Sequence, residues 1–140
     1  MAVYCDVFGM GLMTCRKAER ATEKRYPIHR RMRFAARKHF LNQGWDVVPH
    51  GVGVEGTMAM SDLVIAKRRR IVFIECLTPH WVTFVNAQRK RQLERYYPLW
   101  FVIEDPAIAD DASYRGRVER LVKRSRVYFW SQRNGLTLHR

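Results

Sequence analysis

The chain has 140 residues, and 47% of them are apolar, so we expect a single domain over residues 1–140 with its own core. Its formal net charge of +13 exceeds what solubility requires and favours a polyanionic partner, with nucleic acid first and an anionic membrane surface second. No apolar run reaches the roughly 18 residues that span a bilayer. We therefore expect an intracellular, cytoplasmic or nucleic-acid-associated protein without a membrane segment.

The N-terminal third of the chain is expected to be largely helical. A short strand over 2–8 and a helix from about Thr14 precede a stronger helix that begins near Pro27 and ends at Gly44. The apolar positions of this second helix recur at helical spacing and are Ile28, Met32, Ala35, Ala36 and Phe40. Its other face carries the cations Arg30, Arg31, Arg37 and Lys38. A short strand over 45–49 and a glycine-rich connection over 51–56 follow.

Two apolar runs, 63–66 and 71–74, occupy the centre of the chain and are expected to form a hairpin that turns at Arg68-Arg69. The elements expected after them are a helix over 84–97, a strand over 99–103, a basic helix over 114–124 and a last strand over 127–130. The sequence therefore predicts an α/β fold with a mixed central sheet of four or more strands flanked by helices. The predicted order is αβββαβ, with additions at both ends of the chain.

Two acids stand at these central runs: Asp62 precedes the first, and Glu75 lies inside the second. A turn at Arg68-Arg69 pairs Asp62 with Glu75, and two like charges so placed destabilise a sheet unless a cation lies between them. Carboxylate oxygens are suitable ligands for Mg²⁺ or Mn²⁺. Two other interpretations remain open, since Asp62 could be a turn residue and Glu75 could pair with an arginine. A register shifted by one residue would place the acids on opposite faces.

The order of a helix, a strand, "SD" opening a second strand, "IEC" inside a third, and then a helix and a strand resembles the PD-(D/E)XK nuclease superfamily. Its small Holliday-junction-resolvase-like members are the most similar, and the resemblance covers residues 27–104. It implies a metal-dependent phosphodiesterase with Asp62, Glu75 and the backbone carbonyl of Cys76 as metal ligands. Gln92 and Tyr96, on the helix that follows, are similar to the Q-x-x-x-Y signature of the recombination-exonuclease branch.

Two positions depart from this family pattern. Leu77 stands where the family has a lysine that positions the attacking water, and Arg33 stands where the first helix of the resolvase-like members supplies a glutamate. Arg89 is the preferred substitute for the lysine, because it falls on the same side of its helix as Gln92. A permanently protonated arginine can stabilise a phosphate but leaves the activation of water to the metal. Glu55 is a candidate additional ligand.

Three functions follow from these observations. The first, which we expect, is a metal-dependent endonuclease acting on DNA, branched or single-stranded, as a homodimer if both strands of a duplex are cut. The second is a catalytically lapsed nuclease fold that binds nucleic acid or serves as a structural subunit of a larger complex. The third is a basic ribonucleoprotein component whose acids pair with arginines. The residues expected to contact nucleic acid are Arg30, Arg31, Arg37, Lys38, Lys67, Arg68, Arg69, Arg70 and Tyr96.

Overall fold

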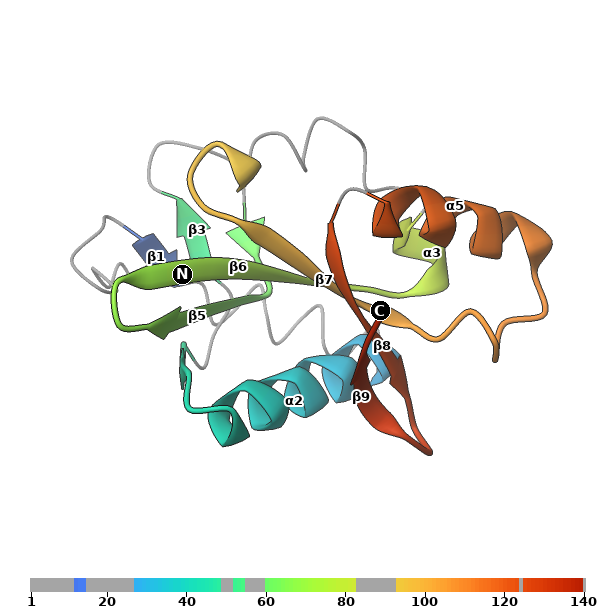
Figure 1. The fold of residues 1–140 in the computed structure, drawn as a ribbon, viewed down its shortest axis with the longest axis horizontal. Helices are drawn as coiled ribbons and strands as arrows, with labels where there is room; N and C mark the ends of the chain where they lie inside the picture. The colour runs from blue at the N-terminus through green and yellow to red at the C-terminus, as the bar shows by residue number, and fades with distance from the viewer. Residues whose placement is uncertain are drawn as a thin grey trace.

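The structure, a computed structural model, describes residues 12–14, 27–48, 52–54, 60–82, 93–123 and 125–139. A six-stranded mixed sheet forms the centre of the fold (Figure 1). Its strands, in spatial order, are β2 (Asp46–Val47), β5 (Leu63–Lys67), β6 (Arg70–Leu77), β7 (Leu99–Glu104), β8 (Arg126–Ser131) and β9 (Gly135–Leu138). A second sheet joins β1 (Leu12–Thr14), β3 (Val52–Val54) and β4 (Met60–Ser61). The predicted α/β class with a mixed sheet is confirmed.

Helices cover both faces of the six-stranded sheet (Figure 1). Helix α2 (Pro27–Asn42) lies on one face, whereas α5 (Ala112–Val122) and the short α3 (Pro79–Val82) lie on the other. The alternation of side chains along β6 divides the core between these layers, since Ile74 packs with residues of α2 and Phe73 packs with residues of α5. No helix in the described part of the chain is long and apolar enough to cross a bilayer.

Helix α2 ends as predicted, because Gly44 adopts a φ of +85° in the left-handed region that favours glycine after a helix. Its buried stripe consists of His29, Met32, Arg33, Ala36 and Phe40. The prediction that Ile28 belongs to the core is wrong: its side chain is 44% exposed, since it lies outside the stripe that starts one residue later. The cations predicted for the outer face, Arg30, Arg31 and Lys38, are exposed, and Arg37 is partly buried.

The β5–β6 hairpin has the register that the sequence predicts. Leu63 pairs with Ile74 and Lys67 pairs with Arg70, which leaves Arg68 and Arg69 as a two-residue turn. Arg68 has a φ of +59° and is the one non-glycine residue of the described ranges with a positive φ. The turn thus places a bulky side chain in a backbone conformation that glycine or asparagine adopts more readily.

The later elements follow the predicted order. Strands β6, β7 and β8 are parallel, as in α/β folds, and β9 returns antiparallel to β8. Asp111 caps α5, since its carboxylate accepts hydrogen bonds from the amides of Ser113 and Tyr114 at 2.9 and 3.2 Å.

Several expectations differ from the structure or lie outside the residues that it describes. The connection expected over 51–56 contains a strand, β3, and β9 was not expected at all. The helix expected over 84–97 falls mostly outside the described residues, which show its last turn at Leu93 and Glu94. The strand expected over 2–8 also lies outside the described residues. The helix expected from about Thr14 falls on residues 15–26, which are outside them too, and Thr14 itself ends strand β1.

Candidate functional site at the start of β5

Ser61 joins the start of β5 to β6 through its side chain. Its hydroxyl lies 2.9 Å from the carbonyl oxygen of Ile74, accepts from the Ile74 amide at 3.2 Å, and lies 2.7 Å from the carbonyl oxygen of Leu63. The Ser61 hydroxyl therefore contacts both the amide and the carbonyl oxygen of Ile74, the groups that a partner backbone contacts in a regular pair of strands. The regular pairing of β5 with β6 begins only at Leu63. Asp62, which lies between Ser61 and Leu63, is therefore outside this pairing, and its side chain can depart from the alternation of the strand.

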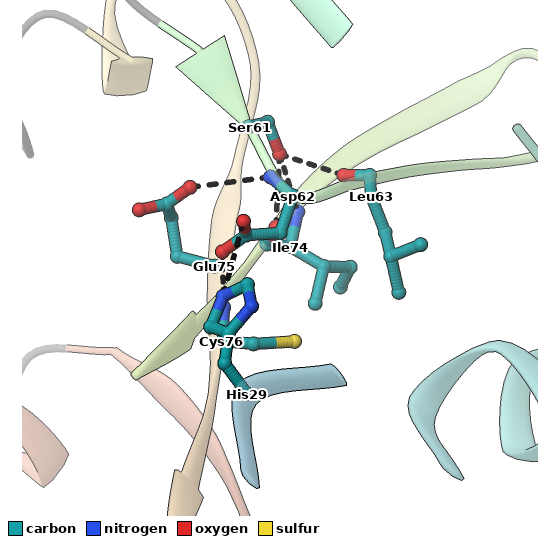
Figure 2. A network of polar contacts seen from close by, with 7 residues as sticks. All are labelled: His29, Ser61, Asp62, Leu63, Ile74, Glu75 and Cys76. Atoms are coloured by element: carbon teal, nitrogen blue, oxygen red, sulfur yellow. Dashed lines mark hydrogen bonds and ion pairs between the residues drawn. The ribbon is translucent and has the colours of Figure 1, made fainter. Parts of the chain in front are cut away.

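Asp62 makes three polar contacts at this point (Figure 2). Its amide donates to Glu75 Oε1 at 3.2 Å, its Oδ2 accepts from the Cys76 amide at 2.8 Å, and its Oδ1 lies 3.2 Å from His29 Nε2. Asp62 and Glu75 are neighbours, as predicted, but the expectation that their side chains share one face of the sheet is wrong, because Asp62 contacts α2 whereas Glu75 lies in the layer of α5. The hydrogen bond that joins them runs from the Asp62 backbone to the Glu75 carboxylate.

The two carboxylates have different surroundings. The Asp62 side chain is 22% exposed and contacts the first turn of α2 through His29. Glu75 is 3% exposed, and Figure 2 shows its side chain and the Cys76 thiol extending to opposite sides of β6. Since Cys76 packs in the layer of α2, Glu75 belongs to the opposite layer. Asp62 thus departs from the alternation of β5, in which Val64 packs in the layer of α5.

Arg33 places a positive charge beside these acids. It is 7% exposed and lies one helical turn after His29 on the buried stripe of α2. Burial lowers the pKa of the Arg33 guanidinium, and the negative charge of Asp62 opposes that decrease. The glutamate that the family resemblance leads one to expect at this position is therefore replaced by a cation that interacts with Asp62.

Cys76 is a buried structural thiol. Burial raises the pKa of its thiol well above the ordinary value, and the negative charges of Asp62 and Glu75 raise it further. Its amide, rather than its sulfur, contributes to the site by holding the Asp62 carboxylate.

Three of the four carboxylate oxygens of Asp62 and Glu75 face donors from the protein. Both oxygens of Asp62 face protein donors, Glu75 Oε1 accepts from an amide, and the nearby Arg33 is cationic. Within the described ranges, no three or more His, Cys, Asp or Glu side chains are grouped so that they could hold a metal ion. The predicted Mg²⁺ or Mn²⁺ site at Asp62, Glu75 and Cys76 would require Asp62 to release His29.

The described residues do not include the remaining predicted catalytic residues. Arg89, Gln92 and Glu55 lie outside the described residues. Tyr96 follows the last turn of its helix and is 43% exposed. Leu77, at the position of the family lysine, is 3% exposed and packs in the core layer of α5. A buried leucine can supply neither the charge nor the proton chemistry of that lysine.

The predicted nucleic-acid-binding cations follow the length of the hairpin. His29 places the start of α2 beside Asp62, and Lys67 Nζ donates to the Gln43 carbonyl oxygen at 2.7 Å just after the helix ends. The exposed cations of α2 therefore lie between the acidic site and the β5–β6 turn, where Lys67, Arg68, Arg69 and Arg70 are all exposed. We call this set, with Arg30, Arg31, Arg37 and Lys38, the basic surface.

Sequence reasoning missed His29 and Arg33 as members of the site. A signal for both was present, since His29, Met32, Arg33 and Ala36 have the spacing of one helical stripe. Polar residues on an otherwise apolar stripe are buried with it and require a partner.

Comparison of the chain with protein-family models, with curated proteins and with solved structures found no match. The resemblance to the PD-(D/E)XK nucleases therefore rests on the residue pattern quoted above and on the order of the elements.

Proposed function

We propose that this protein binds nucleic acid through the basic surface, on a nuclease-like frame whose acidic pair is held by protein donors. The observation that carries the proposal is the line of exposed cations along α2 and the β5–β6 turn. Within the described residues, none of Arg30, Arg31 and Lys38 forms a salt bridge, and the same is true of the four turn cations Lys67, Arg68, Arg69 and Arg70. Cations without carboxylate partners leave their charge available to an external anion.

Nucleic acid is the polyanion that best matches this surface. The cations of α2 lie between Arg30 and Lys38, about 12 Å along the helix axis, and the turn cations extend this length, so the surface can reach several backbone phosphates of a duplex. Neutralising those phosphates releases condensed counterions, which is the main source of affinity without sequence preference. The net charge of +13 adds long-range attraction and speeds association.

The acidic site supports binding without hydrolysis. Asp62 is held by His29 and by the Cys76 amide, and the Arg33 charge lies where a nuclease of the resembled family would carry an acid. With Leu77 buried at the lysine position, the described site lacks the lysine with which the resembled family positions the attacking water. The frame would then serve to present the basic surface.

Charge reversal on α2 tests this proposal. The double variant Arg31→Glu/Lys38→Glu is compared with Arg115→Glu/Lys123→Glu, which makes the same change of net charge on α5, on the other face of the sheet. We expect fluorescence anisotropy with a labelled duplex at low salt to show an affinity loss of about 100-fold for the α2 variant and much less for the α5 variant. Equal losses would mean that net charge alone, and not this surface, attracts the nucleic acid.

A second candidate function, metal-dependent cleavage of DNA, is favoured by the contact between Asp62 and Glu75. It requires Asp62 to exchange His29 for a divalent cation. The test is incubation of branched and single-stranded DNA with Mn²⁺ or Mg²⁺, for the wild type and for Asp62→Asn. Under the first proposal neither protein cuts. Cleavage by the wild type that Asp62→Asn abolishes would establish the second function in its place.

A further inference from the structure

A cluster of aromatic rings lies on the α2 face of the sheet, beyond the end of that helix. Trp100 of β7 contacts Trp45, with ring centroids 5.7 Å apart, and Tyr128 of β8, with centroids 6.1 Å apart. Phe40, in the last turn of α2, packs against both Trp100 and Tyr128. Trp100 and Tyr128 are 6% and 5% exposed, so these rings are part of the core and fixed by it.

Three cations lie on this cluster. The guanidinium carbon of Arg126 is 4.3 Å from the Trp100 ring centroid, and that of Arg70 is 5.1 Å from the same centroid. Lys67 Nζ is 5.7 Å from the ring centroid of Trp45. The register explains the first contact, since Trp100 and Arg126 are paired across β7 and β8. Arg70 and Arg126 therefore come from strands on either side of β7 and meet at one indole.

Stacking on a ring determines what these arginines can still do. A guanidinium that stacks through its face keeps the N–H groups at its edge for other partners, and its restricted side chain loses less freedom when a ligand binds. Arg70 and Arg126 are exposed, and within the described residues neither forms a salt bridge. Arg126 also lies over the Tyr128 ring, with its guanidinium carbon 5.7 Å from the ring centroid, which restricts it further.

We infer that Arg70 of the basic surface and the adjoining Arg126, both held on the Trp100 indole, form the main phosphate-binding site of the protein. This inference rests on the proposed function and names the part of the surface that contributes most of the affinity. The ligand is the backbone phosphate of nucleic acid, because a planar guanidinium matches the oxygens of a phosphate through two parallel hydrogen bonds. Such phosphate contacts carry no sequence information, so this binding does not depend on the bases. Lys67, Arg68 and Arg69, at the adjoining turn, would extend the same contact along the strand.

The cations of α2 provide the comparison that makes the inference specific. Among the described residues, Arg31 and Lys38 show neither a ring contact nor a hydrogen bond, so each must be ordered by the ligand when it binds. Removing two positive charges from α2 or from the Trp100 site changes net charge equally. A difference in affinity between the two double variants therefore reports preorganisation and position, and not charge.

The experiment compares Arg70→Ala/Arg126→Ala with Arg31→Ala/Lys38→Ala by fluorescence anisotropy, with a labelled duplex and a labelled single strand. We expect the first variant to lose at least about tenfold more affinity than the second, and its log–log salt slope on the duplex to become shallower by about 2, since each phosphate contact contributes about 0.9. The variant Arg70→Lys/Arg126→Lys keeps both charges but loses the planar guanidinium groups that donate two parallel hydrogen bonds. It should fall between the wild type and the alanine variant, and it provides the measurement if the alanine variant does not fold.

Equal losses for the Trp100 and α2 variants would overturn the inference and leave the proposed function intact. Failure of the wild type to bind either nucleic acid at low salt would overturn the proposed function, and the inference with it. A third outcome would also contradict the inference: tighter binding of the wild type to phosphatidylserine vesicles than to nucleic acid would identify a membrane surface as the anion.

Discussion

The charged side chains at the two ends of the β5–β6 hairpin differ in sign and in their exposure to solvent. At the start of β5, the carboxylates of Asp62 and Glu75 are surrounded by donors from the protein, including the His29 ring and the Cys76 amide. At the turn and beside it, cations rest on aromatic rings and keep their polar edges in solvent, as Arg70 does on Trp100. The buried charges are satisfied internally, and the exposed charges are left for a partner.

This difference teaches where function should be sought. The acids attract attention in the sequence because a carboxylate inside an apolar run is expensive to bury. In the structure both carboxylates accept hydrogen bonds from backbone amides, and the Arg33 charge interacts with Asp62. The cations at the other end have no such internal explanation. Perturbing each end separately should therefore give a stability effect at one and a binding effect at the other.

The largest effect on stability is expected from removing the cation at the acidic end. Arg33→Met replaces the buried side chain with an apolar one and leaves Asp62 without the positive charge of α2. Removing one partner of a buried charge pair typically lowers the free energy of unfolding by about 3–5 kcal/mol. Because Asp62 is partly exposed, we expect a decrease at the lower end of that range. Urea unfolding followed by circular dichroism measures the change.

A second substitution makes this test specific to the charge. In Arg33→Met/Asp62→Asn the unpaired carboxylate is gone, so we expect the double variant to be more stable than the sum of the two single changes predicts, by about 1 kcal/mol or more. Strict additivity would show that Arg33 does not neutralise Asp62, and the contrast between the two ends would then lose its electrostatic basis.

At the turn, a stabilising change of intermediate size is expected. Arg68 has a φ of +59°, a conformation that costs a residue with a Cβ atom roughly 1 kcal/mol relative to glycine. Arg68→Gly should therefore raise the free energy of unfolding by up to about 1 kcal/mol. Arg69→Gly is the matched control, because it removes the same charge from a residue without a positive φ and should give no gain. A gain of equal size in both variants would point to relief of charge repulsion instead of backbone strain.

The smallest expected effect concerns pH. His39, in the last turn of α2, packs edge-on against Phe40 and Tyr128, and burial lowers the pKa of its imidazole. A base with a lowered pKa in the folded state favours the neutral form, so its contribution to stability is present above the ordinary pKa of 6.5 and is lost as the pH falls through the folded-state value. The free energy of unfolding should decrease between about pH 7.5 and 5.5 less steeply in His39→Gln than in the wild type. Identical pH profiles would contradict this assignment.

Much of the fold could be predicted because local signals agreed with the tertiary arrangement. The apolar runs around Arg68-Arg69 set the hairpin register, and Gly44 ended α2 at the expected residue. Strand β9 was missed although Asn134-Gly135 is a common hairpin signal, and Gly135 has the φ of +65° that such a turn requires. Strand β3 was missed because its pairing with β1 and β4 is a long-range contact that a glycine-rich segment does not announce.

The candidate site was harder to predict than the fold. Spacing was enough to bring Asp62 and Glu75 together, since pairing in a hairpin depends only on where it turns. The partners of Asp62 come from α2, and no local pattern fixes which residues of a helix face a particular strand end. His29 was given no role from the sequence, and Arg33 was noted only as a departure from the family pattern. The stacking of Arg126 on Trp100 likewise depends on the register between two parallel strands far apart in sequence.

The central claim, that nucleic acid binds the basic surface without a metal ion, is tested most directly by the salt dependence of binding in the presence of EDTA. Anisotropy titrations of a labelled duplex between about 50 and 200 mM salt should give a steep linear fall of log affinity with log salt, with a slope of about −5 or steeper if six or more phosphates are contacted. Adding Mg²⁺ should only weaken binding by competition. A slope near zero would remove nucleic acid as the partner, and binding that appears only with Mg²⁺ or Mn²⁺ would show that the acidic end, and not the basic surface, controls recognition.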